Sequence, residues 1–242
     1  MAPGPVVFEM ASMQDFIRYV LAQHTQPSTM VVCSTKEAFL QALQLEAKSD
    51  PSTTGGRQKD TTVDEAALAK RLLYTPTLRL LSTARTLKLA FCHDVTHLRA
   101  YLATYSNTIL QRREESDTAL RQPDVTPTLA ISNPIQLHES TSAFSAQGLN
   151  RTFSVAVEAA HQTQSRLVIA EVPYLSATVE HDEDADPIPP DNPRKPWDEE
   201  VSILNVTTKR LGELSSGRKV KVRTIASRWC TFQQLPSLDD MI

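Results

Sequence analysis

Two short apolar runs bracket one amphipathic stretch near the middle of the chain. Leu129–Ile131 and Leu167–Ala170 have the length and composition of buried strands. Between them, apolar side chains recur at three- and four-residue spacing from Leu149 to Ala160, which places them on one face of a helix. A strand, a crossover helix and a second strand form the unit from which parallel sheets are built. The pattern therefore predicts a parallel β-sheet with a helix packed on it.

The same two periodicities predict further elements on both sides of this unit. Helical spacing covers residues 10–24, 34–47, 63–83 and 95–111, and short apolar runs predict strands at Met30–Cys33, Leu87–Cys92 and 229–232. After a strand-like segment at 201–206, Lys219–Arg223 alternates strictly, so Val220 and Val222 would face one way and the cations the other. Together these elements predict an α/β fold, a mainly parallel sheet flanked by helices, with a C-terminal β-hairpin.

The junction that follows Cys33 lacks the features of a nucleotide-binding loop. Ser34 and Glu37 have the spacing of a capping box, in which each side chain bonds the other's backbone amide at the start of a helix. A phosphate-binding loop needs glycines, whose backbone amides wrap the phosphates, together with a lysine. Lys36 is present without a glycine, and the later strand that ends before Asn133 lacks the carboxylate that would order Mg²⁺. We therefore expect no nucleotide hydrolysis, no cofactor and no enzymatic activity.

Composition changes sharply between residues 176 and 200, where acidic residues and prolines concentrate. Prolines at this density prevent regular structure, so we expect a disordered acidic loop. Trp197 within it would anchor the segment, either on the core or on a partner. The predicted organisation is an N-terminal helical segment at 1–27, an α/β core at 28–175, the acidic loop at 176–200, and a hairpin and tail at 201–242 that complete the same domain.

Overall composition excludes several functional classes. The 242 residues are enough for one good core, and the net charge of −3 argues against a strong overall attraction to nucleic acid or membranes. No run of about 18 apolar residues occurs, so we expect no membrane span. The first residues lack the basic and apolar regions of a signal peptide, so we expect none.

Cysteine and histidine positions do not predict a metal centre. The 3 cysteines are far apart, which is typical of small buried side chains in a reducing compartment. His93 and His97 are four residues apart, a spacing found in metal sites, but no third ligand accompanies them within the helix. We interpret them as a strand end and a surface residue, with Asp94 between them as the N-cap of the next helix.

Cations concentrate near the C-terminal hairpin. Between residues 209 and 228 they are Lys209, Arg210, Arg218, Lys219, Lys221, Arg223 and Arg228. Only Glu213 opposes them, and such a basic face suits contact with the phosphate backbone of DNA or RNA, independent of base sequence. Two alternatives stay open, because the same face could be solvated or could bind the acidic segment of this chain.

Three apolar side chains outside the predicted core are candidates for partner contacts. Phe144 lies in a polar loop at 139–148, at the carboxyl end of a predicted strand, where open parallel sheets bind ligands. An ordinary loop with a helix cap is the alternative interpretation of this stretch. Trp197 lies in the acidic segment, and Leu238 lies in a tail with two aspartates between apolar residues.

The order of predicted elements resembles the core of the RecA/Rad51 ATPase superfamily, which places a β-hairpin region after its parallel strands. The resemblance covers residues 28–232, with Ser34-Thr35-Lys36 where the family has its phosphate loop and Asn133 where it has its Mg²⁺ carboxylate. The chain is thus similar to non-catalytic members such as Rad51 paralogues of the Shu type. This similarity implies a nuclear subunit of a DNA-repair complex that supports homologous recombination, pairs with another RecA-like chain and contacts DNA.

Two other functions fit the same features. Elongator accessory subunits assemble into RecA-like rings that act on tRNA, and similarity to them would imply an RNA ligand and a cytoplasmic location. The other is an α/β enzyme that uses the adjacent His138 and Glu139 for acid–base chemistry. No nucleophile, metal-ligand set or phosphate loop accompanies that pair in the sequence.

Overall fold

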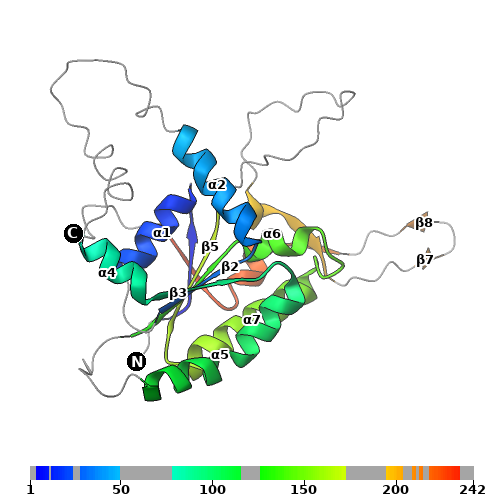
Figure 1. Ribbon diagram of the computed structural model, residues 1–242. Helices are drawn as coiled ribbons and strands as arrows, with labels where there is room; N and C mark the ends of the chain where they lie inside the picture. Colours follow the sequence, from blue (N-terminus) through cyan, green and yellow to red (C-terminus); the bar gives the residue numbers. More distant parts are fainter. Residues whose placement is uncertain are drawn as a thin grey trace.

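A six-stranded, all-parallel sheet forms the centre of the molecule (Figure 1). The computed structural model describes residues 4–10, 12–23, 28–49, 78–115, 126–172, 195–203, 209–210, 213–214 and 218–234. The strands are β1 (Val6–Glu9), β2 (Ser28–Val32), β3 (Leu87–Phe91), β4 (Thr128–Ser132), β5 (Arg166–Glu171) and β10 (Thr231–Gln233). Their order in the sheet is β10-β1-β5-β4-β2-β3, so β10 and β3 form its edges.

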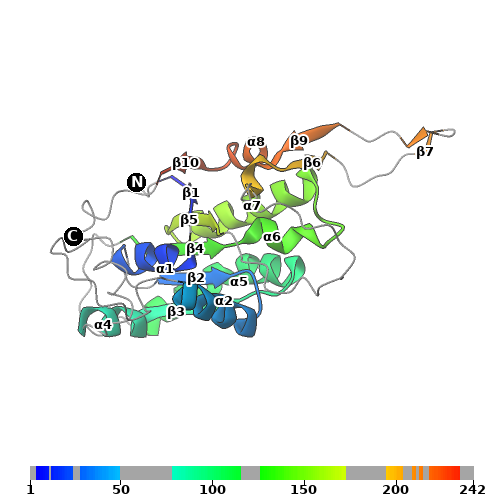
Figure 2. The ribbon, with the colours of Figure 1, turned by 90° about the horizontal axis from the view of Figure 1, so that it is seen from above.

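Helices cover both faces of the sheet and make a three-layer structure (Figure 2). One face carries α1 (Met13–Ala22), α2 (Lys36–Ser49) and α4 (Leu78–Thr86). The other carries α5 (Val95–Glu115), α7 (Ala146–Gln162) and the short α8 (Val222–Ala226). A further short helix, α6 (Pro134–Glu139), follows directly after β4. Across the described ranges, none of these helices combines the length and the apolar character that a membrane crossing requires.

Alternate residues of each central strand supply the two halves of the core. Val7, Val31 and Ile131 pack toward α5 and α7, whereas Phe8 and Met30 pack toward α1 and α2. A sheet that is buried on both faces needs apolar residues at successive positions, which explains why these strands are short continuous apolar runs. The predicted unit of strand, crossover helix and strand is confirmed as β4, α7 and β5, with β4 and β5 paired in parallel.

The α/β fold class, with helices on both faces and a C-terminal hairpin, is confirmed, but the sheet begins earlier than predicted. Val6–Glu9 forms β1, which pairs with both β5 and β10, although only helix was predicted within 1–27. The predicted capping box at Ser34 is also wrong. Thr35 is the residue whose hydroxyl accepts from the Ala38 amide, at 3.2 Å, and α2 begins after it.

The C-terminal hairpin is a ribbon of two antiparallel pairs. β6 (Glu200–Ser202) pairs with β9 (Lys219–Lys221), and β7 (Lys209–Arg210) pairs with β8 (Glu213–Leu214). Figure 2 shows β6 and β9 next to α8, and β7 farther from the sheet. The predicted strand over Lys219–Arg223 is too long, because Val222 is fully buried and starts α8.

The end of the acidic segment is ordered where it meets the core. Residues 176–194 lie outside the described residues, but Pro196–Asp198 forms a 3₁₀ turn, η2, and β6 begins at Glu200. Trp197 is buried beneath this turn, and its ring meets that of Phe232 edge-on at 5.2 Å between centroids. Of the two roles considered for Trp197, the structure therefore shows anchoring on the core.

Candidate functional site at the carboxyl edge of the sheet

The carboxyl ends of the central strands are where an open parallel sheet binds ligands. α1 follows β1 on one face, whereas the next described elements after its neighbour β5, η2 and α8, lie on the other. Neighbouring connections that diverge in this way leave a crevice at the strand ends in open α/β sheets. The polar groups at this edge therefore decide which ligands the domain can take.

The N-terminus of α1, the first helix after the first strand, is occupied by side chains of this chain. The Met13 and Gln14 amides donate to the two carboxylate oxygens of Glu46, at 3.0 and 3.2 Å. The Asp15 amide donates to the hydroxyl of Ser12, the N-cap residue, at 3.1 Å. Free amides at a helix N-terminus are the groups that bind phosphate. Here a carboxylate from α2 takes that place.

A second charged contact ties the ribbon to the end of β1. The Arg223 guanidinium forms an ion pair with Glu9, the last residue of β1, and its Nε lies 3.7 Å from Asp198. The guanidinium also lies over the ring of Phe232, 4.5 Å from its centroid. Arg223 thus joins α8, η2, β1 and β10. This cation is paired within the chain, unlike the free phosphate contact that the sequence predicted for it.

Asn133 stands where a RecA-type strand would end in a carboxylate, and it links the ends of two strands. Its Oδ1 accepts from the Val172 amide at 3.0 Å, and its Nδ2 donates to the Val172 carbonyl at 3.1 Å. The same Nδ2 donates to Gln136 Oε1 at 2.8 Å. Its backbone is left-handed, with φ of 57°, a conformation that asparagine tolerates better than most residues. These contacts give Asn133 a structural role.

Glu171, the last residue of β5, caps the start of α6. Its carboxyl group is buried and accepts hydrogen bonds from the amides of Ile135 and Gln136. Burial raises the pKa of this carboxyl to about 8, while the two amide hydrogen bonds act in the opposite direction. α6 has no capping hydrogen bond from its own N-cap side chain, so Glu171 supplies the missing acceptor from a neighbouring strand.

His138 is held inside the packing between α6 and α7. Its Nδ1 lies 2.7 Å from the Pro134 carbonyl, which can only accept, so Nδ1 carries the proton. Its Nε2 lies 3.0 Å from the Thr152 hydroxyl, which itself accepts from Arg99 Nε at 2.9 Å. Burial lowers the pKa of His138 to about 4, so the ring is neutral at pH 7. Both ring nitrogens are engaged by groups of this chain, and the ring is fully buried.

The predicted basic residues divide into three groups. Arg218, Lys219 and Lys221 are exposed on the ribbon near β9, and Arg228 is exposed in the turn after α8. Lys209 and Arg210 form β7, farther along the ribbon. Acidic residues lie opposite two of the cations in the strand pairing, Glu200 opposite Lys221 and Glu213 opposite Arg210. The structure therefore places all but Arg223 and Arg228 in or next to these two antiparallel pairs.

Phe144 and Leu238 are the other two residues that the sequence suggested for contacts with a partner. Phe144 is half-buried and packs against the core cluster beneath α7. Leu238 lies outside the described residues. The loop around Phe144 leads into α7 through Ser145, whose hydroxyl accepts from the Gly148 amide at 3.1 Å. The ordinary interpretation of this stretch as a loop with a helix cap thus fits its geometry.

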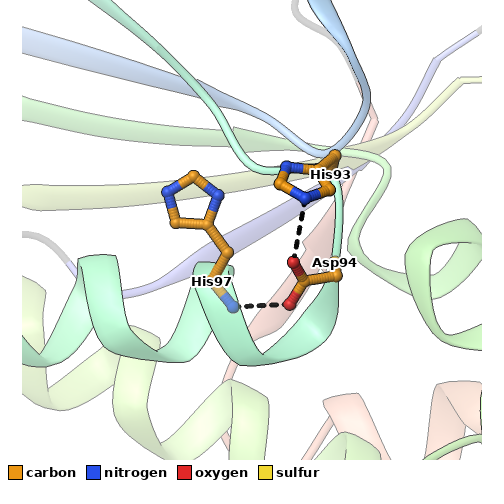
Figure 3. Close-up of side chains that lie close together, drawn as sticks. All are labelled: His93, Asp94 and His97. Carbon is orange, nitrogen blue, oxygen red and sulfur yellow. Dashed lines mark hydrogen bonds and ion pairs between the residues drawn. The ribbon is translucent and has the colours of Figure 1, made fainter.

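Sequence analysis missed a cluster of metal-ligand side chains where β3 meets α5 (Figure 3). One ligand atom each from His93, Asp94 and His97 lies within 4.8 Å of the others. Asp94 is the predicted N-cap, and its Oδ1 accepts from the His97 amide at 2.7 Å, a hydrogen bond that is the main reason why the pKa of this carboxyl is lowered. The third ligand, Asp94, was overlooked because the search for it covered only the helix. Asp94 is the N-cap residue and lies between the two histidines in the sequence.

Comparison with known proteins assigns no family to this chain. No protein-family model matches its sequence, and no curated protein matches it significantly. The basis for a function is therefore the fold and the contacts at its carboxyl edge.

Proposed function

We propose that this chain is a non-catalytic, RecA-like subunit of a nuclear complex for homologous recombination and DNA repair. In this proposal it pairs with another RecA-like chain and contacts DNA through the C-terminal ribbon. The observation that carries the proposal is the Glu46 carboxylate bound to the first amides of α1. The structure adds β1 ahead of the junction at Ser34–Lys36 where the resemblance places the phosphate loop, so α1 is the first helix after the first strand, and its occupied N-terminus supports a domain without a nucleotide site there.

Electrostatics at the strand ends also favour a non-catalytic role. A nucleotide triphosphate at α1 would have to displace Glu46 and would approach Glu9 at the end of β1. Residues 5–10 and 12–23, which flank this junction, contain no glycine and no lysine. Arg18, the one cation among these residues, is paired with Asp15, and without a flexible backbone nest little there offsets the repulsion between phosphate and carboxylate.

The ribbon has the shape and charge that a contact with nucleic acid needs. A two-stranded antiparallel ribbon fits the major groove of DNA, and exposed cations neutralise phosphates without reading the sequence. Arg218, Lys219 and Lys221 are exposed on the paired strands or next to them. Arg223, through Glu9 and Asp198, holds the base of the ribbon on the sheet, so a contact made by the ribbon is transmitted to the whole domain.

Exposed leucines support a partner on the side of the sheet that ends in β3. Leu89 of β3 is 47% exposed, Leu40 of α2 is 46% exposed, and Leu78 and Leu81 of α4 are 87% and 51% exposed. Figure 2 shows α2, α4 and β3 along the same side of the molecule. Exposed apolar patches and open sheet edges are typical of surfaces that bind another chain. A second RecA-like subunit would dock here in the proposed complex.

DNA binding is tested by its salt dependence. We expect the full chain to bind duplex DNA, and the variant R218A/K219A/K221A to lower the slope of log K against log[salt] by roughly three units, about 0.9 for each phosphate contact. Fluorescence anisotropy with labelled duplex, single-stranded DNA and tRNA measures both quantities. The matched control K36A/R85A/R151A removes three exposed cations elsewhere and should leave the slope as in the wild type.

The same titration separates the alternatives. An unchanged slope in the ribbon variant removes the DNA-contact role. A clear preference for tRNA over both DNA forms replaces the repair function with the Elongator-like one.

A further inference from the structure

We propose that His93, Asp94 and His97 bind one divalent transition-metal ion of the zinc class. The three side chains meet where β3 ends and α5 begins, away from α1 and the ribbon, so the proposal is independent of the function above. Figure 3 shows the Asp94 carboxylate bonded to the His93 ring and to the His97 backbone amide, with the His97 imidazole nearby. An ion held there would fasten the end of an edge strand to the first turn of the helix that follows it.

The distances are close to those of a tetrahedral site. Zinc–nitrogen and zinc–oxygen bonds of about 2.0–2.1 Å place the ligand atoms about 3.3–3.4 Å apart. His93 Nε2 and Asp94 Oδ2 are already 3.2 Å apart. The widest separation among the three ligand atoms is no more than 4.8 Å. Both histidines are exposed, so a small rotation of the imidazoles closes the remaining gap without disturbing the core.

A hydrogen bond within the chain already orients the Asp94 carboxylate. Asp94 Oδ1 is held by the His97 amide, which leaves Oδ2 for the ion. His97 lies in the first turn of α5, so the same backbone that orients the carboxylate also places this imidazole. Such preorganisation lowers the entropic cost of assembling a site from exposed side chains.

The donor set defines the class of ion. Two imidazoles and one carboxylate suit zinc and its neighbours, whereas calcium and magnesium prefer sites made only of oxygen. Neutral imidazoles and one carboxylate leave a divalent ion with a net positive charge and one open position in a tetrahedron. Water fills that position in the free protein, as in zinc sites with three protein ligands.

A cobalt titration of the untagged full chain tests the proposal. We expect one Co²⁺ per chain, seen as visible absorption of a nitrogen- and oxygen-ligated ion, and its displacement by Zn²⁺. H93A, H97A and D94N should each weaken binding by about tenfold or more, because even outer-shell partners of a metal contribute that much. Asparagine keeps the cap of α5, so D94N removes the ligand without removing the helix start.

A control and a second readout keep the test decisive. H161A removes an exposed histidine from α7 and should bind cobalt like the wild type. Zinc should raise the melting temperature of the wild type and of H161A but not of H93A/H97A, because an ion that binds only the folded state stabilises it. Unchanged affinity in H93A/H97A, absence of saturable binding, or a strong thiolate charge-transfer band that places the ion on a cysteine would overturn the proposal.

Discussion

Three buried polar side chains at the carboxyl edge are bonded to partners from this same chain. Asn133 is bonded to Val172, Glu171 to the first amides of α6, and His138 to Pro134 and Thr152. A buried polar group without a partner costs about 1–3 kcal/mol, so each of these pairs stabilises one particular arrangement of the strand ends. Asn133, Glu171 and His138 therefore help to hold the strand ends in place.

Glu171 makes the stability of the protein depend on pH. Its pKa is about 8 in the folded state against an ordinary value of 4.5, so the folded chain keeps a proton that the unfolded chain releases. Stability is then highest below the unfolded pKa and falls as pH rises toward 8, by at most about 1.4 kcal/mol per pH unit. We expect E171Q, which keeps an acceptor for α6 but cannot ionise, to remove this fall.

Urea unfolding at a series of pH values between about 6.5 and 8 measures the effect as the difference in slope between the wild type and E171Q, because the titration of His138 contributes to both proteins. The matched control is E158Q, which changes an exposed glutamate of α7 and should keep the wild-type slope. If E171Q and the wild type lose stability equally as pH rises through this range, the carboxyl is ionised in the folded protein and the assignment is wrong.

At the scale of elements, long and strongly periodic segments could be predicted and short ones could not. α7 and its flanking strands follow directly from apolar spacing. β1 was missed because its apolar run is only three residues long and follows Pro5. Lys219–Arg223 alternates like a strand, but the Val222 amide bonds the Glu199 carbonyl at 2.9 Å and the chain turns into α8. That contact comes from a distant segment and has no local signal.

The first turn of α7 depends on a glycine for close packing. A Cβ at Gly148 would overlap the backbone carbonyl of Ala143 in the preceding loop. We therefore expect G148A to destabilise the protein by about 1–3 kcal/mol, although alanine normally favours a helix. Chemical denaturation measures the change, and G4A is the control, because a Cβ at Gly4 meets nothing within 4 Å. Equal stability of the two variants would show that the loop before α7 can move away at little cost.

For the whole molecule, the sequence predicted the fold class better than the site. Sheet and helices depend on periodicity along the chain, which a single sequence displays. The contacts that define the carboxyl edge join residues far apart, such as Met13 with Glu46 and Glu9 with Arg223. Nothing in the neighbourhood of Glu46 marks it as the partner of a helix N-terminus. The sequence showed no glycine-rich phosphate loop at Ser34–Lys36, but it gave no sign that Glu46 binds the first amides of α1.

The most direct measurement is a calorimetric titration of the full chain with MgATP, followed by an assay for phosphate release. Because Glu46 holds the first amides of α1, we expect no saturable heat of binding and no hydrolysis above the uncatalysed rate. Saturable binding, together with hydrolysis that a substitution at the α1 junction abolishes, would contradict the account and identify the chain as an active nucleotide-hydrolysing enzyme.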